Sequence, residues 1–543
     1  MSPGCGLSRA INRKNNFARD RTMKIPRSIF GLLAFIFLPA LANGAAGFDS
    51  AQMAENLEST AHKLEISLAA ARTPLPVFDV AKDFGANNSG HQVTTRQIQD
   101  AIDACASHGS GTVFFPPGIY LTGTLILKSG VHIELAERAK ILGSTDAKDY
   151  LIISPQYKNN TDRQVNKSLF YAEGVTDISL TGKGSINFQG DSLVYQPSHD
   201  NDPLRPFGIR FVTCTNVYVS GLMLINSPQW MQHYLNCENV MIEGLNVFNH
   251  AHQNNDGMDI DGCRNVYVRN CRVDSDDDGI CLKATGPQSC ENILIENCIT
   301  SSHCNALKLG TETTSGFKNI LYRNCQVVPS VTGHHFINGS PTARTAITLI
   351  ITDGGTMENV WFDKIEATDC ITPIFVTLGN RSRKYTADAP KPGIGRIENI
   401  LLSNIKATGA GPISSSITGL DLSHQIKNVT LENISLTLTN PGNDKDRQTD
   451  MDKVLKRVKP GYPSPESWGD LPSHGFYFRY VDGLQLANIE LKLACNDPRE
   501  AIVTQDCIHV EDHLMPQKVQ AQDQSQNQGA ELHEVSQKNK GGS

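Results

Sequence analysis

The chain has 543 residues, a hydrophobic fraction of 39% and a formal net charge of −7. This length can supply a large core, either in several domains or in one long repeat domain. Because the chain carries no basic excess, nucleic acid is not an expected partner.

The first segment with a clear pattern is an export signal over residues 23–42. Lys24 and Arg27 supply positive charge, residues 29–38 are apolar, and the Ala-Leu-Ala sequence at 40–42 fits a small-residue cleavage site. The apolar run is about ten residues long, which is too short to span a bilayer as a helix. We therefore expect a secreted or periplasmic protein with no membrane partner.

Helices and short strands are predicted ahead of the main repeat. Apolar residues recur at helical spacing in 48–72 and again in 95–106. Short runs of strand-forming residues predict strands at 77–80, 112–115, 125–127 and 131–135.

A repeated strand motif then begins after residue 177. Each copy opens with Asn and continues with residues that favour strands, and the copies start at Asn216, Asn239, Asn265, Asn292, Asn319, Asn359, Asn399 and Asn428. The first four offsets are 23, 26, 27 and 27 residues, a period typical of solenoids. Since each unit holds short strands and no long helix, the pattern predicts an all-β protein, a parallel β-helix.

Asn and Cys are predicted to have separate roles in these coils. Asn at a turn tolerates left-handed backbone and can hydrogen-bond its counterpart in the next coil. The chain has 14 Cys, and many recur within the repeat, where free Cys behaves as a small buried hydrophobe. We expect a mostly reduced stack of core cysteines, in which a stray pair could form a disulfide. A zinc site is not expected, because the spacing of the cysteines does not fit the usual pattern.

The C-terminal part is predicted to leave the regular repeat. Residues 441–475 are polar and proline-rich, and predict an extended loop with a short helix at 451–458. Strands are expected again at 475–478 and 484–486. Residues 517–543 are polar with almost no apolar side chains and predict a disordered tail. The β-helix domain is accordingly assigned to residues 77–510.

Three aspartates are the main candidates for catalysis. Asp256 precedes one repeat strand, and Asp277 and Asp278 lie one coil later. Since neighbouring strands lie about 4.8 Å apart, these carboxyls can converge on one surface. Such a group suits glycoside hydrolysis, in which one carboxyl is held protonated and another ionised. A calcium site or a solvated acidic turn is the alternative.

The same stretches resemble glycoside hydrolase family 28, the polygalacturonase family. Residues 254–259 are similar to its Asn-Thr-Asp-Gly motif, and residues 275–283 are similar to its Gly-Asp-Asp-Cys motif. Further similar stretches are residues 84–86, 111–118, 205–206 and 227–230 with His233. The resemblance covers about residues 77–490.

The resemblance implies an inverting hydrolase on a right-handed parallel β-helix, the pectin-lyase-like solenoid. By position, Asp277 is the general acid, and Asp256 and Asp278 hold and deprotonate the attacking water. Inverting enzymes leave about 6.5–9.5 Å between the carboxyls for that water. No metal ion and no cofactor are predicted.

Two departures from the family pattern limit the choice of substrate. The family's Gly-His-Gly motif is replaced by Cys304, Asn305 and Ala306, with His303 out of register. The Arg-Ile-Lys motif associated with a uronate carboxylate should fall within residues 347–352, which hold no basic residue. Because an Arg–carboxylate fork is the strong way to bind a uronate, its loss favours a related pectin linkage such as that of rhamnogalacturonan.

Substrate contacts are predicted for Lys283, Lys308, His252 and His233, each weighed against an ordinary structural role. Other polar residues of this region are interpreted as structural. Surface charge on inserted loops, with part of a substrate rim as the alternative, is the interpretation for Arg381, Arg383, Lys384, His334 and His335. Asp259 and Asp261 are interpreted as turn-forming residues, and Glu312, at the border of the expected cleft, is given no role.

Taken together, the patterns predict a monomeric enzyme that cleaves α-glycosidic bonds in pectin-type polysaccharide, either polygalacturonan or rhamnogalacturonan. Two alternatives stay open. One is a calcium-dependent pectate or polysaccharide lyase on the same fold, whose products carry an ultraviolet-absorbing double bond. The other is a non-catalytic carbohydrate-binding β-helix, which releases no reducing ends.

Overall fold

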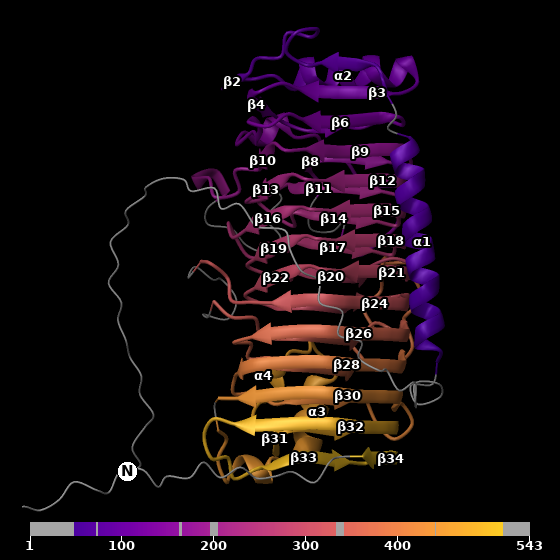
Figure 1. Ribbon diagram of the computed structural model, residues 1–543, viewed down its shortest axis with the longest axis vertical. Helices are drawn as coiled ribbons and strands as arrows, with labels where there is room; N and C mark the ends of the chain where they lie inside the picture. Colours follow the sequence, from indigo (N-terminus) through magenta and orange to yellow (C-terminus); the bar gives the residue numbers. More distant parts are fainter. Residues whose placement is uncertain are drawn as a thin grey trace, which may run out of the picture. The chain divides into compact units, whose positions relative to one another are not determined.

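The computed structural model describes residues 48–71, 74–161, 166–195, 205–332, 341–439 and 441–513. Their strands pair in parallel and stack as the coils of a solenoid (Figure 1). The fold is a right-handed parallel β-helix, so the predicted fold class is confirmed.

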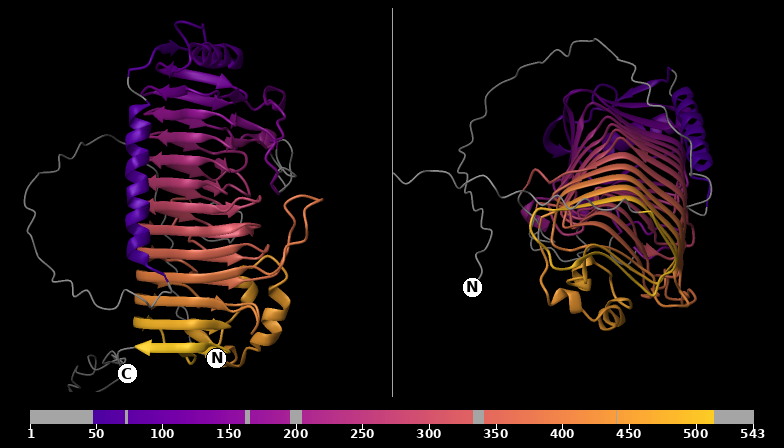
Figure 2. Two further views of the ribbon diagram at one scale, coloured as in Figure 1. Left: turned by 90° about the vertical axis from the view of Figure 1, so that its right-hand side faces the viewer. Right: turned by 60° about the horizontal axis from the view of Figure 1, so that its bottom comes forward.

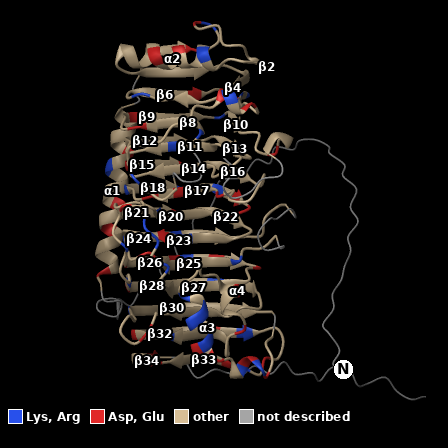
Figure 3. Ribbon diagram, turned by 180° about the vertical axis from the view of Figure 1, so that it is seen from behind, with Lys and Arg blue, Asp and Glu red and all other residues tan. Residues whose placement is uncertain are grey.

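One face of the solenoid is a sheet of 12 described strands, which Figure 3 views from outside. Each strand pairs with its counterpart one coil away. Its strands are β5 (Leu125–Ile126), β8 (Ser168–Glu173), β11 (Phe207–Val212), β14 (Gln232–Leu235), β17 (Met258–Asp261), β20 (Ile280–Ala284), β23 (Asn305–Thr313), β25 (Thr345–Ile351), β27 (Thr372–Leu378), β29 (Ser415–Thr418), β31 (Ser473–Arg479) and β33 (Glu500–Gln505).

The remaining 22 described strands form a second sheet. They are β1 (Val77–Asp79), β2 (Ser89–Val93), β3 (Gly111–Phe115), β4 (Gly118–Thr122), β6 (Val131–Leu135), β7 (Ala139–Gly143), β9 (Thr176–Gly182), β10 (Ser185–Asn187), β12 (Thr215–Ser220), β13 (Met223–Ile225), β15 (Glu238–Glu243), β16 (Asn246–Asn249), β18 (Arg264–Arg269), β19 (Arg272–Ser275), β21 (Cys290–Glu296), β22 (Ile299–Ser302), β24 (Gly316–Val327), β26 (Thr356–Thr368), β28 (Arg396–Ala410), β30 (Ile426–Leu438), β32 (Val481–Leu493) and β34 (Ile508–His513). The long strand β24 pairs with both β21 and β22, so two rows of short strands merge into one from that coil onward.

The repeated Asn residues form a ladder along this second sheet. The eight Asn predicted from the repeat have φ between 53° and 61°, a left-handed conformation that Asn tolerates better than most residues. Seven of them donate from Nδ2 to Oδ1 of the Asn one coil earlier, over 2.9–3.3 Å, and the first, Asn216, donates to Oδ1 of Asp177 over 2.9 Å. The predicted ladder is therefore confirmed, and it fixes the register of successive coils.

The interior of the solenoid is a continuous apolar core. Inward-facing side chains of successive coils stack, as Ile260, Leu282 and Leu309 do in β17, β20 and β23. Nine free cysteines belong to this core: Cys105, Cys214, Cys237, Cys263, Cys271, Cys290, Cys298, Cys325 and Cys370. The expectation of reduced, stacked cysteines is confirmed for these positions.

Four α-helices lie outside the coils: α1 (Ser50–Ala70), α2 (Thr95–His108), α3 (Met451–Val458) and α4 (Pro465–Trp468). Helix α1 buries one face against an apolar stripe that includes Tyr218, Met241 and Tyr267. Helix α2 packs against the first coils, and α3 and α4 lie on a different side of the solenoid from α1 (Figure 2). Short 3₁₀ turns occur at Ala147–Asp149, Leu193–Tyr195 and Asp446–Gln448.

The predicted helices agree with these elements, and the prediction at 451–458 matches α3 residue for residue. Helix α1 precedes residue 77 and β34 ends at residue 513, so the limits 77–510 stay a prediction for the domain. The predicted signal at 23–42 and tail at 517–543 lie outside the described residues. Within the described residues, none of the helices combines the length and the apolar character needed to cross a membrane.

Candidate active site

The outward faces of three adjacent strands, β17, β20 and β23, carry charged residues at matching positions. Asp259, Cys281 and Lys308 are paired in register across these strands, and Asp261 pairs with Lys283. Because side chains alternate along a strand, the apolar neighbours of these residues point into the core. The charged rows therefore stack on the outside of the 12-stranded sheet.

The three predicted acids lie in turns that enter this sheet. Asp256 precedes β17, and Asp277 and Asp278 precede β20. Backbone hydrogen bonds hold the two turns together: the N–H of Gly257 donates to the carbonyl of Asp278 over 2.8 Å, and the N–H of Asp277 donates to that of Asn255 over 3.3 Å. The structure thus brings the single acid and the acid pair to one place.

Two buried lysines neutralise these acids. Lys283 Nζ lies 3.2 Å from Asp256 Oδ2, 3.2 Å from Asp259 Oδ1 and 3.6 Å from Asp278 Oδ2. Lys308 Nζ lies 2.6 Å from Asp278 Oδ2. Both lysines are buried, which argues against the alternative of an ordinary solvated lysine, and their contact with substrate stays a prediction.

The two adjacent acids are in different electrostatic states. Burial and the charge of Asp278 raise the pKa of Asp277 to about 6. Burial opposes ionisation of Asp278 as well, but Lys308 and Lys283 outweigh it and lower the pKa of that carboxyl. Burial and the charge of Asp259 hold the pKa of Asp256 well above its usual value. Asp277 is partly exposed, whereas Asp256 and Asp278 are buried.

A second group of charges surrounds Glu312, to which the sequence assigned no role. Its carboxylate lies 2.7 Å from Arg383, 3.6 Å from Arg381 and 3.8 Å from Lys283. Burial opposes its ionisation, but these cations hold the pKa of Glu312 well below its usual range. Arg381 also donates from Nε to Asp353 over 3.0 Å. Arg381 is therefore held among these charges, and its interpretation as surface charge is wrong, whereas Arg383 pairs with Glu312 but stays 37% exposed.

Asp259 and Asp261 lie within strand β17 and are fully buried, so their prediction as turn-forming residues is wrong. Burial raises the pKa of Asp259 to about 7, against the opposing charge of Lys283. Asp261 accepts a hydrogen bond from the Thr285 N–H over 2.8 Å and contacts His233 Nε2 at 3.0 Å. These two acids belong to the same outward-facing rows as Lys283 and Lys308.

The two histidines predicted to contact substrate are buried. His233 is inaccessible to solvent and its Nε2 contacts Asp261. His252 is 1% exposed, and its Nε2 lies 2.7 Å from the carbonyl oxygen of Gly190. In this conformation neither can touch a sugar, so the structure corrects both assignments to supporting positions. His334 and His335 lie outside the described residues.

Two cysteines depart from the predicted core stack. Cys281 faces outward between Asp259 and Lys308. Cys304 Sγ lies within 4.8 Å of one carboxylate oxygen of Asp277 and one of Asp278. Both belong to the charged outer row, and the repeat pattern alone could not separate them from the inward-facing cysteines.

The chain matches glycosyl hydrolases family 28 over residues 105–454, which is more than half of its length. The chain belongs to this family. Its own geometry shows how the family's acid motifs converge here.

Relatives with known names agree with this assignment. The chain is 30% identical over 213 residues to a probable polygalacturonase of Vitis vinifera, covering 37% of this chain, and 25% identical over 194 residues to exopolygalacturonase X of Aspergillus niger, covering 34%. The chain spans 43% of the length of each of these relatives. The solved exopolygalacturonase of Thermotoga maritima has a TM-score of 0.60 at 20% identity, covering 80% of this chain and 96% of that one; this likeness supports the fold.

The structure explains both departures from the family 28 motifs. Asn305, in place of the family's His, donates from Nδ2 to Asp278 Oδ1 over 2.7 Å. The segment without the basic motif lies in β25, where Thr348 pairs in register with Lys308 of β23, the strand of the preceding coil. A cation is therefore present beside the missing motif, but it comes from β23 instead of β25.

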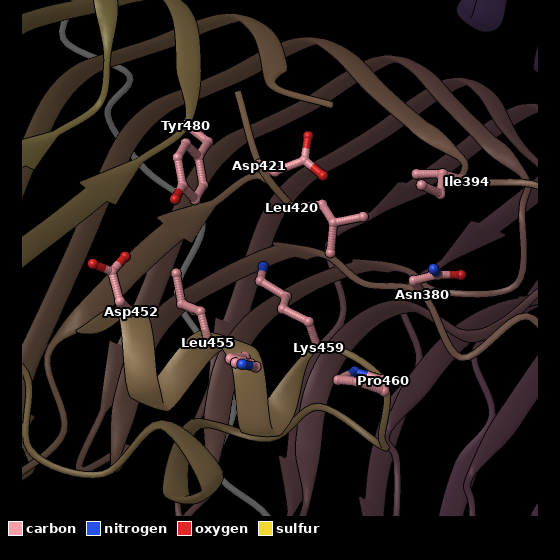
Figure 4. A pocket seen from close by; sticks show the side chains of 10 residues that line it. Asn380, Ile394, Leu420, Asp421, Asp452, Leu455, Lys459, Pro460 and Tyr480 are labelled. Atoms are coloured by element: carbon pink, nitrogen blue, oxygen red, sulfur yellow. The ribbon is translucent and has the colours of Figure 1, made fainter. Parts of the chain in front are cut away.

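A cavity of about 400 Å³ lies away from these acids, between α3 and the loop after β27 (Figure 4). Its lining includes Asn380, Asp421, Leu455, Lys459 and Tyr480. None of the predicted site residues lines it.

Proposed function

We propose that this family 28 chain is an inverting glycoside hydrolase that cleaves α-glycosidic bonds in pectin-type polysaccharide. The observation that carries the proposal is the contrast between two adjacent carboxyls. The pKa of Asp277 is raised to about 6, while that of Asp278 is lowered. Titratable pairs whose pKa values are pushed apart are how an enzyme assigns an acid and a base.

The proposed roles follow from this contrast. Asp277, partly exposed and protonated at mildly acidic pH, gives its proton to the leaving glycosidic oxygen. Asp278, kept ionised by Lys308 and Lys283, deprotonates the attacking water, and Asp256, whose pKa is raised, helps to hold that water.

The lysines also weigh against the lyase alternative. That chemistry needs a calcium ion coordinated by several of the clustered carboxylates. Lys283 Nζ already lies within 3.2 Å of both Asp256 and Asp259, so an ammonium group neutralises the centre of the cluster. A dication at the same point would meet electrostatic repulsion from it.

An acidic substrate, either polygalacturonan or rhamnogalacturonan, is supported by the cations around Glu312. Arg383 has an exposed side-chain fraction of 37%. An accessible guanidinium is a strong partner for a carboxylate. We propose that Arg383 binds a uronate of the substrate in place of the missing basic motif. The exposed ring of Tyr462, whose hydroxyl accepts from Lys308 Nζ over 3.2 Å, lies beside this region.

We further propose that the protein is secreted or periplasmic and acts as a monomer. The export pattern at 23–42 supports the location. A polymeric pectin substrate, found outside the cell, supports it as well. Fractionation of the expressing cells and light scattering of the purified protein test these two statements.

Replacing Asp277 with Asn tests the proposed reaction. Asp277→Asn should lower kcat about 10²- to 10⁴-fold, because it removes the proton donor, while thermal unfolding stays close to that of the wild type. The assay measures reducing ends released from homogalacturonan, rhamnogalacturonan and their oligosaccharides. Asp444→Asn, at an exposed position, is the matched control. Ultraviolet-absorbing products, or near-normal turnover in folded Asp277→Asn, would overturn the proposal.

Replacing Arg383 with Gln tests the substrate class. Arg383→Gln should raise KM for a free-acid oligogalacturonide about tenfold or more, because one charge-assisted hydrogen bond to the carboxylate is lost. The methyl-esterified oligosaccharide, which lacks that charge, should show little difference between the two proteins. Arg396→Gln, at an exposed position on β28, is the control. An equal KM for both proteins on the acid substrate would remove Arg383 from recognition.

A further inference from the structure

A second polar cluster lies directly behind the acid pair. It consists of His250, Asp274, Asp276 and His303, all at most 9% exposed. One side-chain atom each of His250, Asp276 and His303 lies within 4.8 Å of the other two. Asp276 is the residue immediately before Asp277, so this cluster supports the turn that carries the proposed general acid.

His250 is oriented by its contact with Asp274. Its Nε2 lies 2.8 Å from Asp274 Oδ1, which requires a proton on Nε2, because the carboxylate can only accept. The other ring nitrogen, Nδ1, is buried and has no hydrogen-bond partner among the described residues. It points toward Asp276 Oδ1 at 3.9 Å. In the neutral form of the ring, a lone pair on Nδ1 faces this carboxylate oxygen, and a cation between the two atoms would satisfy both.

His303 approaches the same oxygen from the next coil. Its Nδ1 lies 2.8 Å from Asp276 Oδ1, a hydrogen bond whose proton a bound metal ion would displace, and its ring centroid lies 4.9 Å from that of His250. Two imidazole nitrogens and one carboxylate oxygen therefore converge on one point. Asp274, behind His250, completes the arrangement in which a metal-bound His donates its other N–H to a carboxylate.

We propose that His250, Asp276 and His303 form a binding site for a divalent transition-metal ion, with Asp274 orienting His250. Two imidazoles and a carboxylate are ligands that suit zinc and its neighbours, whereas calcium prefers six to eight oxygen ligands. A dication would also balance the two carboxylates in this buried place. The site departs from the expectation that the chain binds no metal.

The sequence carries the same signal in two places. The Gly-Asp-Asp-Cys motif has Gly before its acid pair, whereas this chain has Asp276 there. His303 is out of register with the Gly-His-Gly motif, and the structure places it against Asp276 instead of against Asp277 or Asp278. Strands β16, β19 and β22 lead into these positions in three successive coils, so a bound ion would join them and brace the catalytic turn.

Metal content tests the site without reference to activity. The full chain is stripped with a chelator and dialysed against excess ZnCl₂ and then against metal-free buffer, and retained zinc is measured by mass spectrometry. About one Zn²⁺ per chain is expected, with a raised melting temperature, because an ion that binds only the folded state stabilises it. Cobalt(II) in the same site should give the visible absorption of a low-symmetry nitrogen–oxygen complex.

Two variants and a control make the result specific. His303→Gln keeps a hydrogen-bonding group beside Asp276 but removes an imidazole ligand, and should abolish retention of zinc. Asp274→Asn should weaken zinc binding about 10- to 100-fold, as loss of a partner behind a metal ligand does. His424→Ala removes a histidine that pairs with Asp421 on an exposed turn, and should retain the full amount of zinc.

Two outcomes would overturn the proposal. Wild-type protein that retains no zinc and shows no change in melting temperature would mean that a proton, not a metal ion, fills the space beside His250. Zinc retained equally by His303→Gln would place the ion elsewhere. Neither result depends on whether the chain hydrolyses pectin, so the two proposals fail separately.

Discussion

Buried lysines occur in two regions of the solenoid, and their pKa values are shifted in opposite directions in the two regions. At the acid cluster, the charges of Asp278 and Asp259 outweigh burial and raise the pKa values of Lys308 and Lys283. Beneath α3, Lys459 is equally buried, but burial and the nearby charge of Arg479 lower its pKa well below the usual value.

The difference lies in the partners. Lys459 Nζ donates to four neutral oxygens, on Thr377, Leu378 and Thr418, over 2.7–3.0 Å. It anchors the end of α3 to β27 and β29 beside the cavity of Figure 4. Burial of a lysine is therefore not by itself a sign of a reactive site, since carboxylates in contact with it are what make the first region electrostatically active.

The largest loss of stability is expected from breaking the pair between Lys308 and Asp278. Lys308→Met should lower the free energy of unfolding by about 3–5 kcal/mol, because it leaves Asp278 with one fewer buried counter-charge. Urea unfolding measures the loss. Lys318→Met is the matched control, since Lys318 pairs with Glu358 on the surface, and should change stability by less than about 1 kcal/mol. An equal loss of stability in both variants would mean that the buried Lys308–Asp278 pair stabilises the fold no more than the surface Lys318–Glu358 pair does.

A smaller effect is expected in the neutral region. Lys459→Met should cost about 1–3 kcal/mol, because the oxygens of Thr377 and Thr418 lose a donor while the cost of burying an ammonium disappears. Thermal and urea unfolding measure it. Lys456→Met, on the exposed face of the same helix, is the control and should be close to neutral. A loss in Lys459→Met larger than that in Lys308→Met would reverse the ranking.

A contrast between repeated and single residues explains how much of the fold and the site the sequence could predict. The period of the Asn motifs predicts the coil, because every Asn has one repeated task in a left-handed turn. The acids Asp256, Asp277 and Asp278 could be placed together because they lie about one repeat apart along the chain. Asp259 could not be assigned correctly, since one acid near a turn gives no sign of whether it lies in the turn or faces outward from the strand beside it.

Contacts between segments far apart in the chain were beyond sequence reasoning. Arg383 reaches Glu312 from 71 residues away, and Tyr462 reaches Lys308 from 154 residues away. Both come from inserted loops with no repeat of their own. Lys308 itself was predicted from the sequence, and the missing basic motif agrees with it, because a site that needs a cation can draw it from the neighbouring coil.

The last expected effect is the pH dependence of stability that the two lysines cause. Lys459 has a lowered folded-state pKa, so the unfolded chain binds more protons between that value and about 10.5. Its contribution to stability therefore rises with pH in this window, by up to about 1.4 kcal/mol per pH unit. Lys308 has a raised pKa, so its contribution is fully present below about 10.5 and is lost only above it.

Unfolding of the wild type and both Met variants between pH 8 and 10 measures this difference. The gap between wild type and Lys459→Met should change in favour of the wild type as pH rises, whereas the gap between wild type and Lys308→Met should stay constant. Since other groups titrate equally in all three proteins, they cancel in these gaps. Parallel curves for the two variants would mean that both lysines remain charged in the folded protein, and that neutral oxygens hold an ammonium as well as carboxylates do.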